Sequence, residues 1–250
     1  MRRNVVQAAS ARLVASLGVL ALTSPALAGD AANFLPLGFS ADGRYFAYEE
    51  FGVQDGSGFP FSNVFILDVA EDKWSGGSPF RVRIEEEQPG LVQVREQSHE
   101  KAAQALADLA ITEPPVIVAL NGDAEPVEDR RALSFGAPGF GLEPPTDIST
   151  LTLSTFPSTS TLPCVESYGF DAPVGFALEL KTGDGVRELH RDKTVPASRS
   201  CTVDYRLHGV VAPVNWAWRN FAPVAIVSVY SHGFEGPDRR FIAVPVTASP

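Results

Sequence analysis

The sequence predicts a mostly β fold, in which antiparallel meanders and hairpins form a sandwich or a partial-propeller-like domain with one amphipathic helix and one disulfide. Short runs rich in Val, Ile, Phe and Tyr recur between turns that contain Gly, Pro, Asn or Asp, as expected for antiparallel strands. Helical spacing is confined to one stretch, near residues 91–111. The length after a predicted leader suits a single β-rich domain over 29–250.

Residues 1–28 have the features of a cleaved Sec-type signal peptide. Three arginines and no acidic residue make the first dozen residues positive, and the apolar run Leu13–Leu22 follows. That run has the length of a signal h-region and is too short to span a bilayer, which needs roughly 20 apolar residues. Small residues before the predicted cleavage site, between Ala28 and Gly29, suit signal peptidase. We therefore expect a periplasmic or secreted protein of a Gram-negative bacterium, with no transmembrane segment after processing.

The charge balance restricts the partners. The chain carries 20 Lys and Arg against 30 Asp and Glu, a formal net charge of −10. Nucleic-acid backbones are held by clustered Lys and Arg, so the acidic excess argues against nucleic acid as a partner. Another envelope protein or periplasmic component is the expected partner.

The two cysteines, Cys164 and Cys201, are expected to form a disulfide. Exported proteins commonly oxidise a lone pair of cysteines, because their compartment is oxidising. Such a bridge stabilises the fold by about 3–4 kcal/mol, mainly by restricting the unfolded chain. Two free buried thiols are the alternative.

The first strands of the mature chain read as a four-stranded meander. Residues 33–39 and 44–49 flank a Ser-Ala-Asp-Gly sequence that suits a type I turn, with Gly43 at positive φ. Runs 63–69 and 81–84 complete the meander. The stretch resembles one blade of the propeller repeats in the periplasmic TolB protein, where Ser-x-Asp-Gly-Arg/Lys occupies the same kind of turn. No further copy occurs at a blade-length period, so a complete propeller is not predicted.

The middle of the chain predicts a helix and then irregular structure. Helical spacing over 91–111 predicts an apolar stripe formed by Val92, His99, Ala103, Leu106 and Ala110. We interpret His99 on that stripe as a partly buried structural histidine. The Pro-, Gly- and Ser/Thr-rich stretch 113–163 predicts long irregular loops, within which 116–120 and 151–156 could each supply a short strand.

The second half of the chain predicts further hairpins. Runs 175–181 and 187–190 flank a Thr-Gly-Asp-Gly turn, and 202–208 alternates as a half-exposed strand does. Residues 224–230 (VAIVSVY) are apolar on both faces and predict a central strand, which turns into 240–246.

A family resemblance is carried by the two ends of the mature chain. Segments 33–45 (NFLPLGFSADGRY), 49–60 (EEFGVQDGSGFP) and 233–243 (GFEGPDRRFIA) resemble a family of predicted secreted bacterial proteins, domain of unknown function 2259. The likeness extends over most of the mature chain and includes the cysteine pair. It implies export and a single domain. It implies no activity, so no functional residues are carried over.

Familiar catalytic motifs do not occur in the sequence. It contains no zinc-binding His-x-Glu-x-x-His spacing, no Gly-rich phosphate loop, no Gly-x-Ser-x-Gly elbow and no Cys-x-x-Cys. Residues distant in sequence could still converge, either Ser231, His232 and Asp238, or His208 with Glu235. The sequence thus leans against an enzyme without deciding the matter.

Two polar clusters are candidate sites. A Gly-rich loop could offer oxygens to a cation such as calcium, through Glu49, Glu50, Asp55 and Asn63. A solvated acidic loop is the alternative. The second cluster lies in the last hairpin and contains Glu235, Asp238, Arg239 and Arg240. Its arginines could pair with neighbouring carboxylates, which is the interpretation we favour, or could hold a carboxylate-bearing partner.

The sequence as a whole favours a non-enzymatic soluble periplasmic protein that binds another cell-envelope component. Aromatic residues near turns are candidates for the contact surface: Phe59, Phe61, Trp216, Trp218 and Phe221. The alternative is a hydrolase or small-ligand-binding enzyme with its site among the central loops and His208 and His232.

Overall fold

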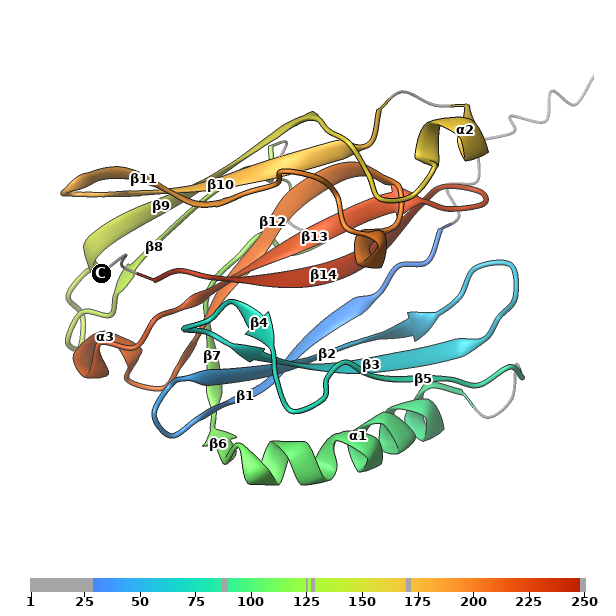
Figure 1. Ribbon diagram of the computed structural model, residues 1–250. Helices are drawn as coiled ribbons and strands as arrows, with labels where there is room; N and C mark the ends of the chain where they lie inside the picture. The colour runs from blue at the N-terminus through green and yellow to red at the C-terminus, as the bar shows by residue number, and fades with distance from the viewer. Residues whose placement is uncertain (1–28, 87–89, 125, 127–128, 170–171, 248–250) are drawn as a thin grey trace, which may run out of the picture.

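Three antiparallel sheets lie in layers, and one long helix covers the outermost layer on one side (Figure 1). The computed structural model describes residues 29–86, 90–124, 126, 129–169 and 172–247. The predicted signal peptide, with Ala28 at its end, lies outside the described residues. The predicted fold class is confirmed, because about 51% of the described residues are strand and 14% are helix, and the sheets are antiparallel.

The N-terminal sheet contains the first six strands. Its order is β4-β3-β2-β1-β6, and β5 also pairs with β3. The strands are β1 Asn33–Ser40, β2 Tyr45–Val53, β3 Pro60–Asp68, β4 Lys73–Trp74, β5 Phe80–Arg83 and β6 Ile111–Glu113. The predicted meander is therefore correct over β1, β2 and β3. Its fourth strand, β5, returns to β3 because the two-residue β4 covers only the end of that strand.

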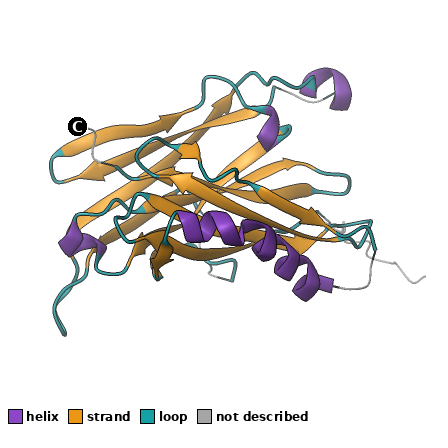
Figure 2. Ribbon diagram, turned by 60° about the horizontal axis from the view of Figure 1, so that its bottom comes forward, coloured by secondary structure: helices purple, strands orange, loops and turns teal. Residues whose placement is uncertain are grey.

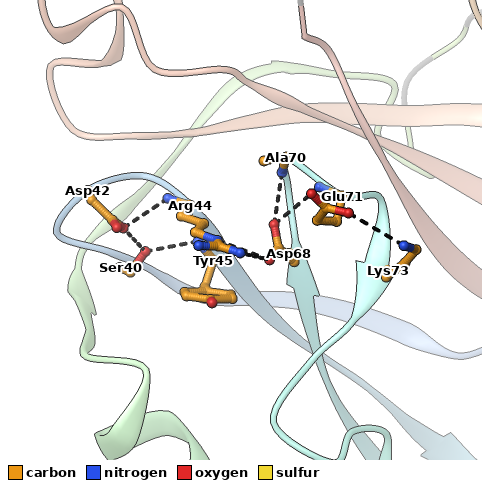
Figure 3. Close-up of polar contacts among 8 residues, drawn as sticks. All are labelled: Ser40, Asp42, Arg44, Tyr45, Asp68, Ala70, Glu71 and Lys73. Carbon is orange, nitrogen blue, oxygen red and sulfur yellow. Dashed lines mark hydrogen bonds and ion pairs between the residues drawn. The ribbon is translucent and has the colours of Figure 1, made fainter.

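The β1–β2 turn has the predicted chemistry (Figure 3). Ser40 and Asp42 hold the turn through a 2.6 Å hydrogen bond between Ser40 Oγ and Asp42 Oδ1, and the carbonyl of Ser40 accepts from the N–H of Gly43. Gly43 has φ +72, and a Cβ there would lie 2.8 Å from the Phe221 ring, so both the conformation and the space require glycine.

Helix α1, Gly90–Asp108, lies across the outer face of the N-terminal sheet (Figure 2). Its buried residues are Val94, Ser98 and Ala102, so the predicted stripe is wrong by about one position, and Val92 is 72% exposed. Polar contacts set the rotation of the helix. Ser98 Oγ lies 2.6 Å from the Oγ of Ser62, a buried serine of β3. Apolar periodicity does not report such a contact.

The stretch predicted to form mostly irregular loops, 113–163, contains three strands. These are β7 Pro115–Leu120, β8 Ala132–Ala137 and β9 Thr146–Pro157. Two of them, β7 and β9, overlap the runs 116–120 and 151–156 that could supply short strands. In β9, Leu151 and Leu153 point into the core while Thr152 and Ser154 point outward. The Ser/Thr-rich composition therefore marks the exposed face of a long strand, for which β-branched threonine is well suited.

The remaining strands complete the outer and central sheets. The outer sheet has the order β11-β10-β9-β8 and the central sheet β14-β13-β12-β7. The strands are β10 Val174–Thr182, β11 Gly185–Arg191, β12 Thr202–Pro213, β13 Val224–His232 and β14 Pro237–Pro245. Three short helical segments connect them: α2 Cys164–Tyr168, the 3₁₀ turn η1 Ala197–Arg199, and α3 Trp216–Arg219.

The central sheet is buried on both faces, as its sequence predicts. On β13, Val227 and Val229 pack into the core shared with the outer sheet, whereas Val224 and Ile226 pack into the core shared with the N-terminal sheet. Neighbouring residues of one strand thus belong to different cores, which explains the continuous apolar run.

The predicted disulfide is confirmed between Cys164 and Cys201, with an S–S distance of 2.04 Å. It ties α2 to the chain just before β12. The bridge therefore anchors one end of the segment 192–201, which runs beside the central sheet.

His208 on β12 links the central sheet to the N-terminal sheet. Its ring lies edge-on to Phe34 and Phe241, with ring centres 5.7 and 5.0 Å away. Burial, assisted by the positive charge of Arg239, lowers the pKa of His208 from 6.5 to about 4.

We predict that His208 makes the fold acid-sensitive. Because the pKa is lower in the folded chain, the stabilising contribution is present above pH 6.5 and is lost as the pH falls toward 4. Between neutral pH and about pH 4, the wild type should lose about 3 kcal/mol more of its free energy of unfolding than His208→Phe, because phenylalanine does not titrate. Urea unfolding at about pH 7 and about pH 4.5 measures it. An identical pH dependence in both proteins would contradict the prediction.

Candidate functional site

A cleft of about 610 Å³ opens beside strand β14, between the N-terminal sheet and the segment 190–200. Its volume lies within the range of roughly 300–1,000 Å³ found for small-molecule sites. Polar residues line it from three parts of the fold: Glu50, Asn63, Asp72, Lys73, Arg81, His190, Ser198, Arg199, Ser200, Ser231, Asp238 and Arg240. Apolar residues complete the lining, among them Phe65, Leu67, Trp74, Ile242 and Val244.

Strand β14 is an edge strand of the central sheet, and part of its open edge is closed by polar groups. The N–H of Arg239 donates to the carbonyl of Asp30 at 2.7 Å. The N–H of Phe241 donates to Glu50 Oε2 at 3.0 Å, and the hydroxyl of Tyr48 donates to the carbonyl of Phe241. Unpaired strand edges recruit other chains, so these contacts protect this one.

Glu50 and Asn63, from the predicted cation loop, meet in the cleft. Asn63 Nδ2 donates to Glu50 Oε1 at 3.0 Å. Glu50 is 3% exposed, and burial raises the pKa of its carboxyl despite these hydrogen bonds. The other two members of the predicted loop lie elsewhere.

Glu49 points to the opposite face of β2, under helix α1. Its carboxylate accepts from Arg95 at 2.8 and 2.9 Å and lies 3.0 Å from His99 Nε2. Burial opposes ionisation, but the bonds from Arg95, Ser62 and His99 lower the pKa of Glu49 below its usual value. Glu49 thus fixes the helix on the sheet.

Asp55 meets neither of the glutamates. Its N–H donates to Asp30 Oδ1 at 2.6 Å, which closes the β2–β3 loop onto the N-terminal segment. Among the residues that the structure describes, no group of three or more His, Cys, Asp or Glu is placed to hold a metal ion. The four oxygen-bearing residues of the predicted cation loop therefore do not converge.

The arginines of the last hairpin pair with carboxylates far along the chain, not with Glu235 or Asp238 of their own hairpin. Arg240 lies 2.7 Å from Asp30 Oδ2, and Arg239 lies 2.7 Å from Asp123 Oδ1. Asp238 Oδ1 accepts from the N–H of Asp30 at 2.9 Å. Glu235 lies exposed at the tip of the hairpin.

The two polar clusters of the sequence thus contribute to one site. Glu50 and Asn63 from the first cluster, and Asp238 and Arg240 from the second, all line the cleft. Ser231 joins them, because β13 and β14 pair Ser231 with Asp238. Sequence analysis found these residues but not their convergence.

Asp192 holds the wall of the cleft formed by residues 196–200. Its carboxylate accepts from Arg199 at 2.8 and 2.9 Å, from the N–H of Phe176 at 3.0 Å, and lies 2.9 Å from His190 Nε2. Burial would raise its pKa, but His190 and Arg199 lower it. Sequence analysis missed this cluster, because no local motif joins its members.

The β3–β4 turn carries Asp72, Lys73 and Trp74 to the cleft, and Figure 3 shows how it is held. Asp68 accepts from Arg44 at 2.8 and 3.0 Å and from the N–H groups of the turn. Trp74 is 43% exposed. The hydrogen bonds that position Trp74 therefore lie outside the cleft, and part of the Trp74 side chain is exposed to solvent.

Three carboxyl groups that line the cleft share one electrostatic feature. Desolvation raises the pKa of Glu50, Asp72 and Asp238 above the usual values. Glu50 and Asp238 accept hydrogen bonds that offset this desolvation only in part, and perturbed groups gathered in one cleft make it the candidate functional site.

A family profile for predicted secreted proteins, DUF2259, matches residues 47–247. The chain belongs to the DUF2259 family. This match spans the site and both halves of the fold, and it confirms the resemblance carried by the two ends of the chain. A search of curated proteins and a search of solved structures each find no match. None of the helices in the described part of the chain is long and apolar enough to cross a membrane.

The histidines of this DUF2259 chain do not gather at one catalytic centre. His208 lies between Leu207 and Gly209, which pair with Val227 and Ile226, whereas the N–H of His232 donates to the carbonyl of Cys201 near the opposite end of β13. Ser231 and His232 are neighbours on a strand and point to opposite faces.

We predict that Glu50→Gln destabilises the fold. Glutamine keeps one acceptor oxygen but places an amide NH₂ against one of two donors, the Phe241 N–H or Asn63 Nδ2. The expected loss is about 1–3 kcal/mol in the free energy of unfolding. Urea unfolding at neutral pH measures it. Glu71→Gln, at an exposed site, serves as the control and should change stability by less than about 0.5 kcal/mol; equal effects would refute the role of Glu50.

Proposed function

We propose that the protein is a non-enzymatic binding protein of the bacterial periplasm that holds a small polar organic ligand in the cleft beside β14. The observation that carries the proposal is a pair of opposite charges exposed at the cleft. Among the described residues, none forms a hydrogen bond or ion pair with the guanidinium of Arg81 or with the carboxylate of Asp72. Both residues line the cleft.

The other charges of the cleft already have partners in the protein. Arg199 pairs with Asp192, Arg240 with Asp30, and Lys73 lies 3.4 Å from Glu71. These pairs build the walls and leave Arg81 and Asp72 available to a ligand. Sites of this kind combine an apolar lining with a few placed polar groups.

Binding fits the cleft better than hydrolysis by a serine nucleophile. His190 is the histidine of the lining, and its Nε2 is held by Asp192. No serine hydroxyl of the described chain hydrogen-bonds to His190, although Ser198, Ser200 and Ser231 line the same cleft. A nucleophilic serine needs a base within hydrogen-bond reach.

We predict that Arg81→Ala abolishes retention of the ligand. The measurement is native mass spectrometry of the protein purified from the periplasm of its own bacterium, which reports the mass of any co-purifying molecule. Arg83→Ala is the matched control, because Arg83 lies two residues further along β5, pairs with Glu85 and does not line the cleft. Equal retention by both variants, or a wild-type protein without a co-purifying molecule, would contradict the proposal.

The predicted cation loop has a separate test. The unfolding temperature of the protein is measured with added calcium and with added EDTA, and an unchanged temperature would remove the cation site.

A second candidate function is docking of an apolar segment of another envelope protein. Trp218 and Phe140 are 59% and 70% exposed and stack with ring centres 5.6 Å apart. They lie beside an apolar cavity of about 430 Å³, which is lined by Val116, Ile117 and Trp216 among others. Its lining contains no charged side chain. Exposed aromatic groups around an apolar pocket are typical of protein contacts.

Trp218 is one of the predicted contact residues and Phe140 is not, and the other predicted residues are less exposed than Trp218. Trp216 is half-buried against the core. Phe61 is 4% exposed, lies in the core and cannot serve as contact surface. Phe59 and Phe221 are half-buried. Only part of the predicted aromatic surface is therefore available to a partner.

We predict that Trp218→Ala reduces capture of an envelope protein by at least tenfold, as an exposed tryptophan at the centre of an interface would. The measurement is crosslinking in intact periplasm followed by quantitative mass spectrometry against the wild type. Val186→Ala is the control, because Val186 is exposed on β11, away from this cavity. Unchanged capture by Trp218→Ala would remove this second function.

A further inference from the structure

We infer that the ligand of the cleft is a saccharide, whose ring packs on Trp74 while its hydroxyl groups bond to Asp72, Asn63 and Arg81. The inference rests on the proposed ligand-binding function and names the class of ligand. It is carried by one juxtaposition, a half-exposed tryptophan beside planar polar side chains in a single cleft.

Trp74 has the properties of a fixed aromatic platform. Its ring packs against Phe65, with ring centres 5.1 Å apart, and against Tyr48 at 6.3 Å. Its strand is held by pairing with Leu67 and by the turn bonds of Asp68. A tryptophan that is 43% exposed and held by these contacts offers apolar area at little entropic cost, and the C–H face of a sugar ring is apolar.

The polar groups around Trp74 match hydroxyl groups. A carboxylate such as Asp72 only accepts hydrogen bonds, and a guanidinium such as Arg81 only donates them. A sugar hydroxyl does both, so one polyol can satisfy the two groups together. Asn63 adds its Oδ1, because its Nδ2 is used by Glu50, and it neighbours Arg81 across the β3–β5 pair.

The charge balance of the cleft favours a ligand without a large net charge. Arg81 and Asp72, which form no hydrogen bond or ion pair with the described residues through their charged groups, have opposite charges, and Arg199 and Arg240 are neutralised by Asp192 and Asp30. Within the described part of the chain, Glu50 and Asp238 form hydrogen bonds but no ion pair. A strongly anionic or cationic ligand would leave one of the two unpaired charges facing a like charge. An uncharged polyhydroxylated molecule avoids this cost.

The test is isothermal titration of the mature protein with two uncharged sets of probes, N-acetylglucosamine oligomers and maltohexaose, and with galacturonate oligomers as an anionic comparison. We expect at least one uncharged set to bind more tightly than the galacturonate oligomers, Trp74→Ala to weaken that binding by at least tenfold, and Trp74→Phe to weaken it less, because a smaller ring remains. Trp218→Ala is the control, since Trp218 is more exposed than Trp74 and lies outside the cleft. Asp72→Asn provides a second variant that does not disturb packing, and it should also weaken binding.

The outcomes separate this inference from the proposed function. If no saccharide set binds at millimolar concentration while amino acids or dipeptides do, the saccharide class is overturned and the ligand-binding function stands. If a saccharide binds equally well to the wild type, Trp74→Ala and Asp72→Asn, the assignment to this cleft is overturned. If no probe binds and no molecule co-purifies with the wild-type protein, both the inference and the proposed function fail.

Discussion

Burial of both faces of the central sheet is the constraint on which the rest of the structure depends. Strand β13 supplies alternate residues to two cores, so one sheet must cover each face. The outer sheet and the N-terminal sheet meet this requirement, and α1 in turn covers the far side of the N-terminal sheet. The open edge of β14 then needs hydrogen-bond partners other than a strand, and the cleft lies beside this edge.

The edge of β14 is closed by groups from the beginning of the chain. Asp30 accepts from the backbone of Arg239, and Glu50 accepts from the backbone of Phe241. Further along the strand, Ile242 and Val244 line the cleft instead of meeting another strand. Buried polar groups must be hydrogen-bonded, which explains why charged residues collect beside this edge and why most of them occur in pairs.

Residues close in sequence predicted the turns and hairpins, and the expected export of the chain predicted the disulfide, whereas contacts between distant residues determine the site. The Ser40–Gly43 turn and the two-sided run of β13 follow from residues close in sequence. The ion pair between Asp30 and Arg240 joins residues 210 positions apart, which no pattern within a window can show. The helix stripe was predicted one position away because the buried Ser98 bonds to Ser62, and apolar periodicity ignores a buried polar pair.

Two carboxyl groups that hold parts of the fold together, Glu49 under α1 and Asp192 behind the cleft wall, respond to pH in the opposite sense to those that line the cleft. Glu49 and Asp192 have lowered pKa values, so they stabilise the fold above the unfolded values and lose that effect as the pH falls. Glu50, Asp72 and Asp238 have raised pKa values, so their ionisation weakens the fold as the pH rises through the folded values. Burial disfavours the charged forms of the three cleft carboxyl groups, whereas the ion pairs of Glu49 and Asp192 favour theirs. Hydroxyl groups of a ligand that donate to Asp72 would in turn favour its charged form.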